Sequence, residues 1–405
     1  MKQITFIHAA DLHLDSPMIG LSHLPKEIFE RLKESTFVAL KKLVDEAINH
    51  QVDFVILAGD LFDEQDRSVR AQMRLRKEME RLDQYHIPVF VIHGNHDHLN
   101  GKWIHLDMPS NVHIFGEKVE FKKCIAEEIV THLYGFSYGS RHVMESHLNE
   151  YVKHEGADFH IGILHGHGEG SSGHSHYAPF HLKELIDKKF DYWALGHIHK
   201  RSILHENPYI VYPGNIQGRN RKETGKKGSY LVRLTKSDTK LDFIETSDIR
   251  WKTLQLDGQE ANSFQQLYLL CQSKMEENRL QGKGILLSLT LHNVRLPDKE
   301  LASVLNGDLL QTLQDEEREE PSFVWPIQIE IERAYEWNRS QLEKESDFYY
   351  ELFQASDQLD TVTESIRPLY EHPIARKFIP ELTEKEMQVL KQEALQTLLH
   401  LLHQR

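Results

Sequence analysis

The chain has 405 residues, of which 40% are hydrophobic and 27% are charged, with a formal net charge of −14 at pH 7. A chain of this length exceeds the usual size of a single hydrophobic core, so we expect two or more globular domains. Only Cys124 and Cys271 are present, which excludes a disulfide framework, and no apolar run approaches the roughly 18 to 20 residues that span a bilayer.

The first ten residues lack a basic segment followed by an apolar run, so we expect no signal peptide and a cytoplasmic location without membrane contact. The negative net charge opposes binding to nucleic acid, because phosphate contacts normally come from Lys and Arg. It does not exclude such binding, since the sum omits bound metal and does not show where basic residues form local patches.

The first half of the chain alternates short apolar runs with helical patterns. Apolar residues at helical spacing follow the first run (residues 28–47) and the second run (residues 75–82). This alternation predicts an α/β domain built on buried strands. The expected strands are residues 4–9, 54–58, 89–92, 160–164, 192–195 and 210–212.

Two further runs, at residues 228–234 and 241–244, are expected to close this domain, so we place it at residues 1–248. The segment that follows mixes helical and strand patterns and predicts a small α+β domain at residues 249–337. Its expected helices are residues 264–276 and 301–313, and its expected strands are residues 284–291 and 324–332.

Residues 338–405 have a helical pattern to the end of the chain. Thr383 and Glu386 form a capping box in front of the last helix. A helix with one apolar face either packs on its own domain or docks on a partner, and both alternatives remain open. The residues expected along that face are Met387, Leu390, Ala394, Leu398 and Leu401.

Residues that can bind metal follow five of the expected strands. Because ligands gather outside the carboxyl ends of strands in α/β sheets, we expect the five loops to meet at one sheet edge. A single such motif more often consists of surface or core residues that bind no metal. Five motifs in this order are a far more specific signal of a metal site. In chain order the residues are Asp11 and His13, then Asp60 and Asp63, then Asn95, His96 and Asp97, then His165, and finally His197 and His199.

The donor types suit a pair of divalent ions. Carboxylate and amide oxygens with imidazole nitrogens, and no thiolates, favour Mn, Fe or Zn over Mg or Ca. One carboxylate can bridge two ions and hold them about 3.5–4 Å apart. Asp60 is the natural bridge, because the tight turn at Gly59 projects it from a buried strand.

The order of these motifs (Asp-x-His, Gly-Asp-x-x-Asp, Gly-Asn-His-Asp, His, Gly-His-x-His) resembles the calcineurin-like metallophosphoesterase superfamily. Four sequence segments are similar to the SbcD-type DNA-repair exonuclease family, and within it to bacterial proteins of the YhaO type. They are residues 8–15, 59–63, 191–199 and 212–215. The resemblance is strong over roughly residues 1–235 and only architectural beyond them.

The resemblance implies a four-layer α-β-β-α metallophosphoesterase sandwich, with a small α+β cap domain and a helical C-terminal tail. It also implies two divalent ions, commonly Mn²⁺, and in-line attack of water on phosphorus. By this resemblance His96 stabilises the phosphate or protonates the leaving oxygen, and Asp97 orients a neighbouring imidazole. The implied ligands are Asp11, His13 and His199 for one ion, Asn95, His165 and His197 for the other, and Asp60 between them.

Two positions depart from the family pattern. Asp63 stands where some relatives carry His, so any role of that His is unsupported in this chain. Asn215 stands where Ser is commoner. His8 and Asp15 flank the first motif, and for both a positioning role and a structural role remain open.

A basic loop follows the last motif strand and could hold a DNA backbone, although a solvated charged loop fits as well. Its basic residues are Arg219, Arg221, Lys222, Lys226 and Lys227, and the first three are our candidate substrate-binding residues. The Gly- and His-rich residues 166–176 fit either a rim over the substrate or a simple flexible loop.

The resemblance implies a metal-dependent nuclease of DNA repair, an exonuclease or endonuclease that works with an SbcC-type coiled-coil ATPase and that forms a homodimer in some relatives. The first alternative is a phosphodiesterase that acts on nucleotides or cyclic nucleotides. The second is a DNA-binding or scaffold subunit without activity. The complete set of metal-binding residues argues against this last alternative.

Overall fold

The computed structural model describes residues 2–63, 68–101, 104, 106–168, 177–318, 320–332, 339–358, 362–372 and 382–403. The chain divides into two compact units. The first comprises Met1–Leu291 and Arg295–Ile331, and the second comprises His292–Val294 and Glu332–Arg405. The first unit holds both the expected α/β domain and most of the expected α+β domain, and the boundaries at residues 248 and 337 stay predictions.

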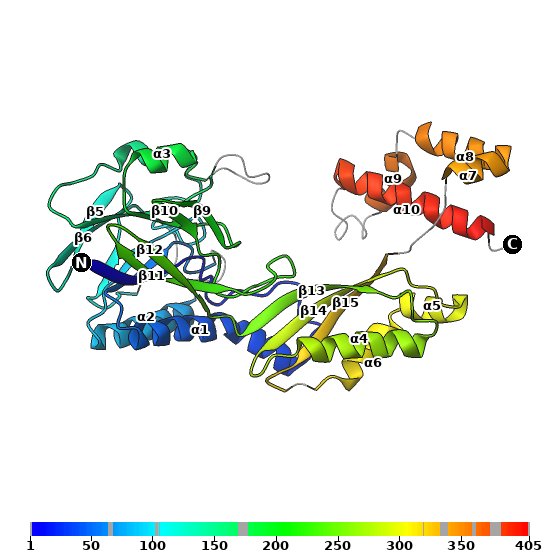
Figure 1. The fold of residues 1–405 in the computed structure, drawn as a ribbon, viewed down its shortest axis with the longest axis horizontal. Helices are drawn as coiled ribbons and strands as arrows, with labels where there is room; N and C mark the ends of the chain where they lie inside the picture. Colours follow the sequence, from blue (N-terminus) through cyan, green and yellow to red (C-terminus); the bar gives the residue numbers. More distant parts are fainter. Residues whose placement is uncertain are drawn as a thin grey trace. The chain divides into compact units, whose positions relative to one another are not determined.

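Two six-stranded sheets form the core of the first unit (Figure 1). In sheet order, the first consists of β12 (Thr239–Glu245), β11 (Gly228–Thr235), β1 (Gln3–Ala9), β2 (Phe54–Ala58), β3 (Val89–Ile92) and β4 (Val112–Ile114). The second consists of β5 (Glu120–Ala126), β6 (Ile129–Gly135), β7 (Phe159–His165), β8 (Tyr192–Gly196), β10 (Tyr209–Tyr212) and β9 (Ser202–Glu206). Strands β1 to β4 are parallel to one another, as are β6, β7, β8 and β10.

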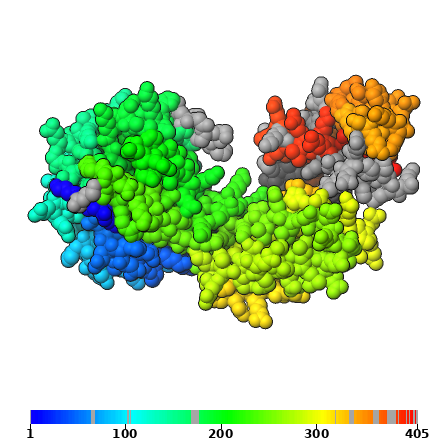
Figure 2. Space-filling view, in the orientation of Figure 1, coloured from blue at the N-terminus to red at the C-terminus, as the bar shows by residue number. Residues whose placement is uncertain are grey.

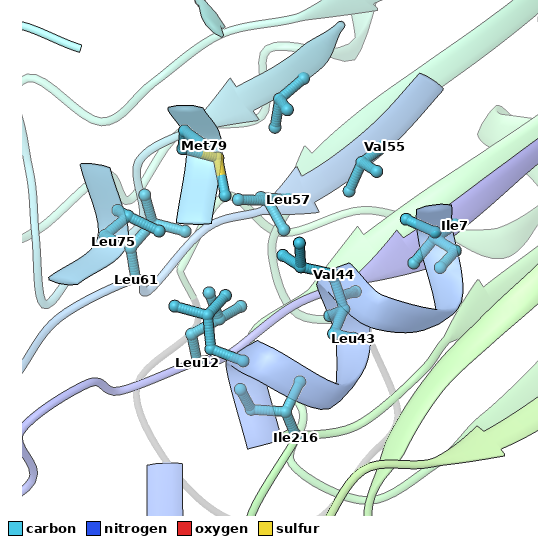
Figure 3. Packing of buried hydrophobic residues seen from close by; sticks show 14 of the residues in the cluster. Ile7, Leu12, Leu43, Val44, Val55, Leu57, Leu61, Leu75, Met79 and Ile216 are labelled. Atoms are coloured by element: carbon cyan, nitrogen blue, oxygen red, sulfur yellow. The ribbon is translucent and has the colours of Figure 1, made fainter. Parts of the chain in front are cut away.

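The side chains of each strand alternate between two apolar layers, as extended backbone requires. Phe6 and Phe54 stack at 4.9 Å between centroids in the layer between the two sheets. Ile7 and Val55 point the other way, into the layer under helices α1 (Lys26–Asn49) and α2 (Val69–Gln84) (Figure 3). A third layer lies beyond the second sheet, where Leu185 of helix α3 (Leu182–Asp187) packs. The predicted four-layer α/β sandwich is therefore confirmed.

Every strand expected in the α/β domain is present, but four further strands and the short helices α3 and η1 (Leu148–Glu150) were not predicted. The four strands are β4, β5, β6 and β9. Strand β5 illustrates the reason, since most of its residues are exposed or half-buried and it lies at the edge of its sheet. Edge strands of this kind lack the continuous apolar run by which buried parallel strands are recognised.

The rest of the first unit is the cap, a three-stranded sheet with helices (Figure 1). The single helix expected at residues 301–313 is wrong. The chain forms two helices there, because Gly307 adopts a φ of 98° that ends the first and starts the second. Strand β13 was not expected as a strand. The cap consists of β13 (Ile249–Asp257), β14 (Gly284–His292), β15 (Val324–Glu332), α4 (Phe264–Asn278), α5 (Asp298–Leu305) and α6 (Asp308–Glu316).

The N-terminal half of α1 joins the cap to the sandwich. Ile28 and Leu32 of this helix share one apolar cluster with Trp251 and Leu286 of the cap. Arg31 donates from its Nε to Asp248 at 2.9 Å and from its Nη2 to the carbonyl of Gly282 at 3.1 Å. Figure 2 shows the surfaces of the sandwich and the cap as continuous, so the two parts form one packed unit.

The second unit consists of helices α7 (Arg339–Glu345), α8 (Asp347–Gln358), α9 (Val362–Glu371) and α10 (Glu384–His403). The capping box is confirmed, because the backbone N–H of Thr383 donates to Glu386 and that of Glu386 donates back to Thr383 Oγ1. The expected apolar face of α10 is wrong at Ala394 and Leu398, and the side chain of Leu401 lies outside the described residues. Leu399 packs with α7 and α8, whereas Ala394 and Leu398 are exposed.

Two expectations about cysteines and membranes can be compared with the described residues. Cys124 and Cys271 are both free and buried, and burial raises the pKa of each thiol to about 12. Neither is therefore a ready nucleophile or metal ligand. Within the described helices, none has both the length and the apolar character needed to cross a bilayer.

Candidate metal centre

The five ligand-bearing loops come from two sheets, which corrects the expectation of one sheet edge. Three follow β1, β2 and β3 of the first sheet, and two follow β7 and β8 of the second. The backbone N–H of Asp11 donates to Gly59 and that of His13 to Asp60, which joins the first two loops. Across the sheets, the backbone N–H of His197 donates to Asp11 Oδ1 at 3.0 Å. The loops thus meet where the carboxyl ends of two facing sheets come together.

Apolar residues within the loops hold them against the core. Leu12 lies between two predicted ligands and Leu61 directly follows a third, and both are almost fully buried. Ile216, from the loop after β10, is fully buried in the same cluster. Figure 3 shows these three side chains among residues of α1 and α2. Burial of each such side chain contributes about 1.5–3 kcal/mol, which keeps the neighbouring polar side chains in place.

Four predicted ligands have a backbone in the left-handed region that residues other than Gly rarely adopt. The φ angle is 52° at Asp11, 42° at His13, 52° at Asp60 and 99° at His197. Each such conformation costs on the order of 1–3 kcal/mol and persists only where the surroundings hold it. Strain of this kind clusters at functional sites, so its occurrence at four predicted ligands supports a functional role for these loops.

Three imidazoles have one ring nitrogen fixed by an oxygen that can only accept. The Nδ1 of His165 donates to the carbonyl of Ala58 at 2.9 Å. The Nδ1 of His13 donates to Asp63 at 2.7 Å, and that of His199 donates to Glu223 at 2.8 Å. In the neutral form of each ring, Nε2 therefore carries a lone pair directed into the cluster, which is the arrangement that metal-binding histidines commonly show.

The two Nε2 atoms of His13 and His199 lie 3.0 Å apart. Since both Nδ1 atoms are donors, these two lone pairs face each other and repel unless a proton or a cation lies between them. The Oδ1 of Asn95 lies 3.1 Å from His165 Nε2 and 3.2 Å from His197 Nδ1. The donor atoms therefore converge in two places, one at His13 and His199 and one around Asn95.

Asp60 lies between these places. Its Oδ2 is 3.7 Å from His13 Nε2 and 3.4 Å from His165 Nε2. Its Oδ1 accepts from the backbone N–H of His96 at 3.0 Å. A side chain at Gly94 would overlap with Asp60 Oδ1, and its Cβ would lie 2.6 Å from His165 Nε2. Glycine at this position therefore leaves the space in which these donors converge.

Negative charge dominates the interior of the cluster. Burial would lower the pKa of His165, but Asp60 and Asp11 raise it to about 9. Burial would raise the pKa of Asp63, but His13 and Arg219 hold it well below its usual value. Asp63 thus stays ionised, and the cluster favours a positive charge within it, which a bound cation would supply.

The donor set fits divalent ions. Among the described residues, three groups place their ligand atoms within 4.8 Å of one another. They are Asp11 with His13 and His199, Asp11 with Asp60 and His165, and His13 with Asp63 and His96. Carboxylate oxygens and imidazole nitrogens in such groups suit first-row transition ions.

Comparison with known proteins agrees with this chemistry. Residues 4–201 match the profile of the family described as calcineurin-like phosphoesterase. The chain is also 41% identical over 400 residues to the metallophosphoesterase YhaO of Bacillus subtilis (strain 168), and the alignment covers 97% of each chain. The protein belongs to the calcineurin-like metallophosphoesterase family. It is therefore a hydrolase of phosphoesters that uses divalent metal ions.

More distant similarity extends to archaeal proteins. The metallophosphoesterase is 28% identical over 270 residues to the DNA double-strand break repair protein Mre11 of Methanocaldococcus jannaschii, and 25% identical over 271 residues to Mre11 of Thermoplasma acidophilum. Each alignment covers 60% of this chain and 66% of the relative. The chain thus aligns with just under two thirds of the length of each of these relatives.

The two residues proposed for catalysis differ in accessibility. The side chain of His96 is 34% exposed, and its Nδ1 lies 3.6 Å from Asp63. Asp97 is fully buried. Its Oδ2 accepts from His93 Nδ1 and from the backbone N–H of Leu61, both at 2.9 Å. His96 can therefore meet a substrate of the metallophosphoesterase, whereas Asp97 acts on other residues of the loops.

Glu223 is a residue of the centre that the sequence analysis did not identify. It accepts from His199 Nδ1 at 2.8 Å, from Asn215 Nδ2 at 2.7 Å and from the backbone N–H of Arg219 at 2.8 Å. Burial would raise its pKa, but His199 and Arg219 hold the pKa well below its usual value. It lies beyond the last motif in a loop of mixed charge, so no spacing signal indicated it.

The basic loop is divided between inward and outward side chains. Arg219 Nη1 donates to both oxygens of Asp63, at 2.9 and 2.8 Å. Lys227 is buried, and its Nζ donates to the carbonyl of His199 at 2.8 Å. Arg221 is exposed and donates to Gln328 of the cap at 2.9 Å. Lys222 and Lys226 are exposed as well. Of the three candidate substrate-binding residues, Arg219 is therefore paired within the centre, whereas Arg221 and Lys222 are exposed.

The alternatives left open for the flanking residues can be compared with their contacts. His8 lies between the sheets, with Nδ1 2.9 Å from Tyr192 Oη and Nε2 3.2 Å from the carbonyl of Leu195. Asp15 accepts from Ser68 Oγ at 2.6 Å, and Ser68 caps the N-terminus of α2. These contacts favour structural roles. Residues 169–176 of the Gly- and His-rich segment lie outside the described residues.

Proposed function

We propose that this metallophosphoesterase hydrolyses phosphodiester bonds in DNA with two divalent ions, and that Mn²⁺ is the ion it uses. The observation that carries the proposal is the convergence of seven predicted ligands from two facing sheets. Three of their imidazoles have Nδ1 fixed and Nε2 directed inward. The seven ligands are Asp11, His13, Asp60, Asn95, His165, His197 and His199.

Two bound divalent ions would lower the pKa of a water molecule and neutralise charge on the phosphate. The residues of the chain supply the rest. Asp11, His13 and His199 would hold one ion, Asn95, His165 and His197 would hold the other, and Asp60 would contribute to both. The fixed imidazoles need no rearrangement when an ion arrives, which favours tight and specific binding.

His96 is the residue that we propose to act on the reacting phosphate. Its ring is partly exposed, and its backbone N–H is fixed by Asp60 at 3.0 Å. From this position the imidazole can donate a hydrogen bond to a phosphate oxygen or a proton to the leaving oxygen. Asp97 holds the loop that carries His96, because it accepts from the backbone N–H groups of Leu61 and Gly94.

Two observations support DNA as the substrate. The chain is similar to Mre11 proteins whose name refers to repair of DNA double-strand breaks. It also carries a cap and a helical second unit in addition to the catalytic sandwich, and hydrolysis of a small ester needs neither. The exposed Arg221, Lys222 and Lys226 lie on the loop beside His199 and would contact the DNA backbone.

We further propose that the protein works in the cytoplasm with an SbcC-type coiled-coil ATPase, as a monomer or a homodimer. Helix α10 supports a docking role, because Val389 is 47% and Leu398 is 41% exposed along it. Apolar side chains of this size on an exposed helix face are suited to a partner helix. Co-purification of the chain with a co-expressed SbcC-type ATPase would test this part of the proposal.

Hydrolysis assays test the substrate directly. Metal-free protein is supplied with Mn²⁺ and given labelled duplex DNA, bis-p-nitrophenyl phosphate or cyclic nucleotides. We expect cleavage of DNA that stops when the metal is chelated. Turnover of the small substrates alone would exclude the nuclease and favour the alternative phosphodiesterase. No turnover of any substrate, with metal bound, would favour a scaffold role.

A further inference from the structure

The loop between β10 and β11, residues 213–227, contacts both the metal centre and the cap. Glu223 accepts a hydrogen bond from His199, and Lys227 Nζ holds the carbonyl of the same residue at 2.8 Å. Arg219 donates to Asp63, which in turn accepts from His13 at 2.7 Å. One side of the 213–227 loop therefore orients two of the predicted ligand imidazoles.

The other side of the 213–227 loop is bound to β13 of the cap. Trp251 Nε1 donates to the carbonyl of Gly218 at 3.0 Å, and its own carbonyl accepts from the backbone N–H of Gly225 at 2.9 Å. Gln217 Nε2 donates to the carbonyl of Ile249 at 2.7 Å. These contacts lie on both sides of Glu223 in the sequence, so β13 holds the segment that carries it.

Residues 213–218 of the 213–227 loop are buried, whereas residues 220–222 and 224–226 are exposed. Glu223 is joined to the buried part, because it accepts from Asn215 Nδ2 at 2.7 Å. Gln217 is 1% exposed and Asn215 is fully buried. At Gly218 a Cβ would lie 2.7 Å from the carbonyl oxygen of Glu223 and 2.9 Å from Trp251 Cδ1. Trp251 itself is buried in the cluster that α1 shares with the cap. Because close-packed interiors have little free volume, a displacement at one end is transmitted to the other.

We propose that the 213–227 loop is a rigid link through which the cap controls the orientation of His199, and with it the affinity of the centre for metal. Glu223 is the positioning residue at the site end of this link, and Trp251 is the anchor at the cap end. A ligand or partner that displaces β13 changes metal occupancy without touching a metal ligand. This inference rests on the proposed function, because it requires His199 to bind metal.

Matched tryptophan variants test the link in the full chain. Trp251→Phe removes the indole N–H that holds Gly218. Trp325→Phe removes the same group of atoms from the same apolar cluster, and none of the hydrogen bonds of the 213–227 loop given above involves Trp325. Calorimetric titration of metal-free protein with Mn²⁺ gives the Kd, and thermal unfolding without metal gives the Tm. Glu223→Gln is measured alone and together with Trp251→Phe.

We expect Trp251→Phe to raise the Kd for Mn²⁺ about 10-fold, at the low end of the 10–100-fold loss typical of groups that orient metal ligands. We expect Trp325→Phe to leave the Kd unchanged. It should nevertheless lower the Tm by about as much as Trp251→Phe does. In the double variant the increase should be smaller than the product of the two single increases, because both residues act on one path.

Equal changes of Kd in the two tryptophan variants would show that general packing is responsible and would overturn the link. A multiplicative effect in the double variant would overturn it as well. Since calorimetry needs no substrate, failure to cleave DNA would count against the proposed function and not against the link. Wild-type protein that binds no Mn²⁺ would overturn both.

Discussion

Charged side chains are buried at the metal centre and exposed in the helical second unit. At the centre, Asp11 and Asp60 are each 1% exposed, and every carboxylate has defined partners. In the second unit, the ion pair of Arg367 with Glu371 joins side chains that are 68% and 64% exposed. Arg339 pairs with Asp357 in a similarly open position. Of these two regions, the metal centre is thus the one that buries charged side chains.

The difference has an energetic meaning. Desolvation of a buried charge costs several kcal/mol, and neighbouring groups repay this only where their geometry is favourable. An exposed pair costs little and contributes about 0–1 kcal/mol. The strained backbone of four predicted ligands adds to the cost at the centre. Buried charges with this free-energy cost are expected to have a function. Substitutions in the two regions can test whether buried and exposed charged groups differ in their effect on stability and activity.

The largest effect is expected for Asp60→Ala. This variant removes the carboxylate that lies between the two sets of donors, so we expect loss of metal binding. Hydrolysis should fall by about 10³-fold or more, out of the about 10⁶-fold or greater acceleration that is typical of enzymes. Calorimetry with Mn²⁺ and assay with bis-p-nitrophenyl phosphate measure the two quantities. Metal binding at wild-type affinity would remove Asp60 from the centre.

His96→Ala separates binding from turnover. We expect the Kd for Mn²⁺ to change by less than about twofold, because the ring is not among the seven ligands, while kcat falls about 10²–10⁴-fold, as expected on loss of a proton donor. The exposed His23 provides the control variant His23→Ala, which should match wild type. Unchanged kcat in His96→Ala would contradict the catalytic assignment.

A pair of glycine variants tests the space inside the centre. In Gly94→Ala the new methyl group overlaps with Asp60 Oδ1, so we expect weaker Mn²⁺ binding and a loss of stability of about 1–3 kcal/mol from overpacking. At Gly116 the nearest atom to a new Cβ is Glu120 Oε1, 3.8 Å away, so Gly116→Ala should change neither. Denaturant unfolding and calorimetry measure both variants. Equal Mn²⁺ affinity and equal stability of the two variants would mean that the centre has room for a methyl group at Gly94.

The smallest effect is expected for an exposed ion pair of the second unit. Arg367→Ala removes an exposed pair and should change stability by no more than about 0.5 kcal/mol. Leu399→Ala, in the small apolar cluster of the same unit, should cost about 2–5 kcal/mol. Far-UV circular dichroism during thermal unfolding of the full chain detects the difference. A large effect of Arg367→Ala would erase the contrast between the two regions.

The success of sequence reasoning differs between the same two regions. At the centre, buried parallel strands and polar residues directly after them were both recognisable, because each strand is a short apolar run and each loop carries several donors. In α10 the apolar residues are common on all sides, so the face that packs was assigned one position away from Leu399. The cap helix was misjudged at Gly307, because a glycine inside a helical pattern either is tolerated or ends the helix, and the pattern does not distinguish the two.

Glu223 and Lys227 could not be identified from sequence, since their partners are brought to them only by folding. Glu223 meets His199 because β10 is parallel to β8, so the 213–227 loop starts at the same carboxyl edge as the loop that carries His199. Lys227 belonged to a segment that looked like a uniform basic loop, yet its Nζ is buried beside the carbonyl of His199. Charge alone does not indicate direction, and the direction of these side chains decides what they do.

The sequence by itself determined the α/β character of the first domain, the chemistry of its donors and the family to which the chain belongs, because short apolar runs and the motifs after them are local features. Only the tertiary structure decided that the donors come from two facing sheets, that the imidazoles are fixed by oxygen acceptors, and that the cap is joined to the centre. Those facts depend on contacts between residues far apart in the chain, and local patterns carry no record of such contacts.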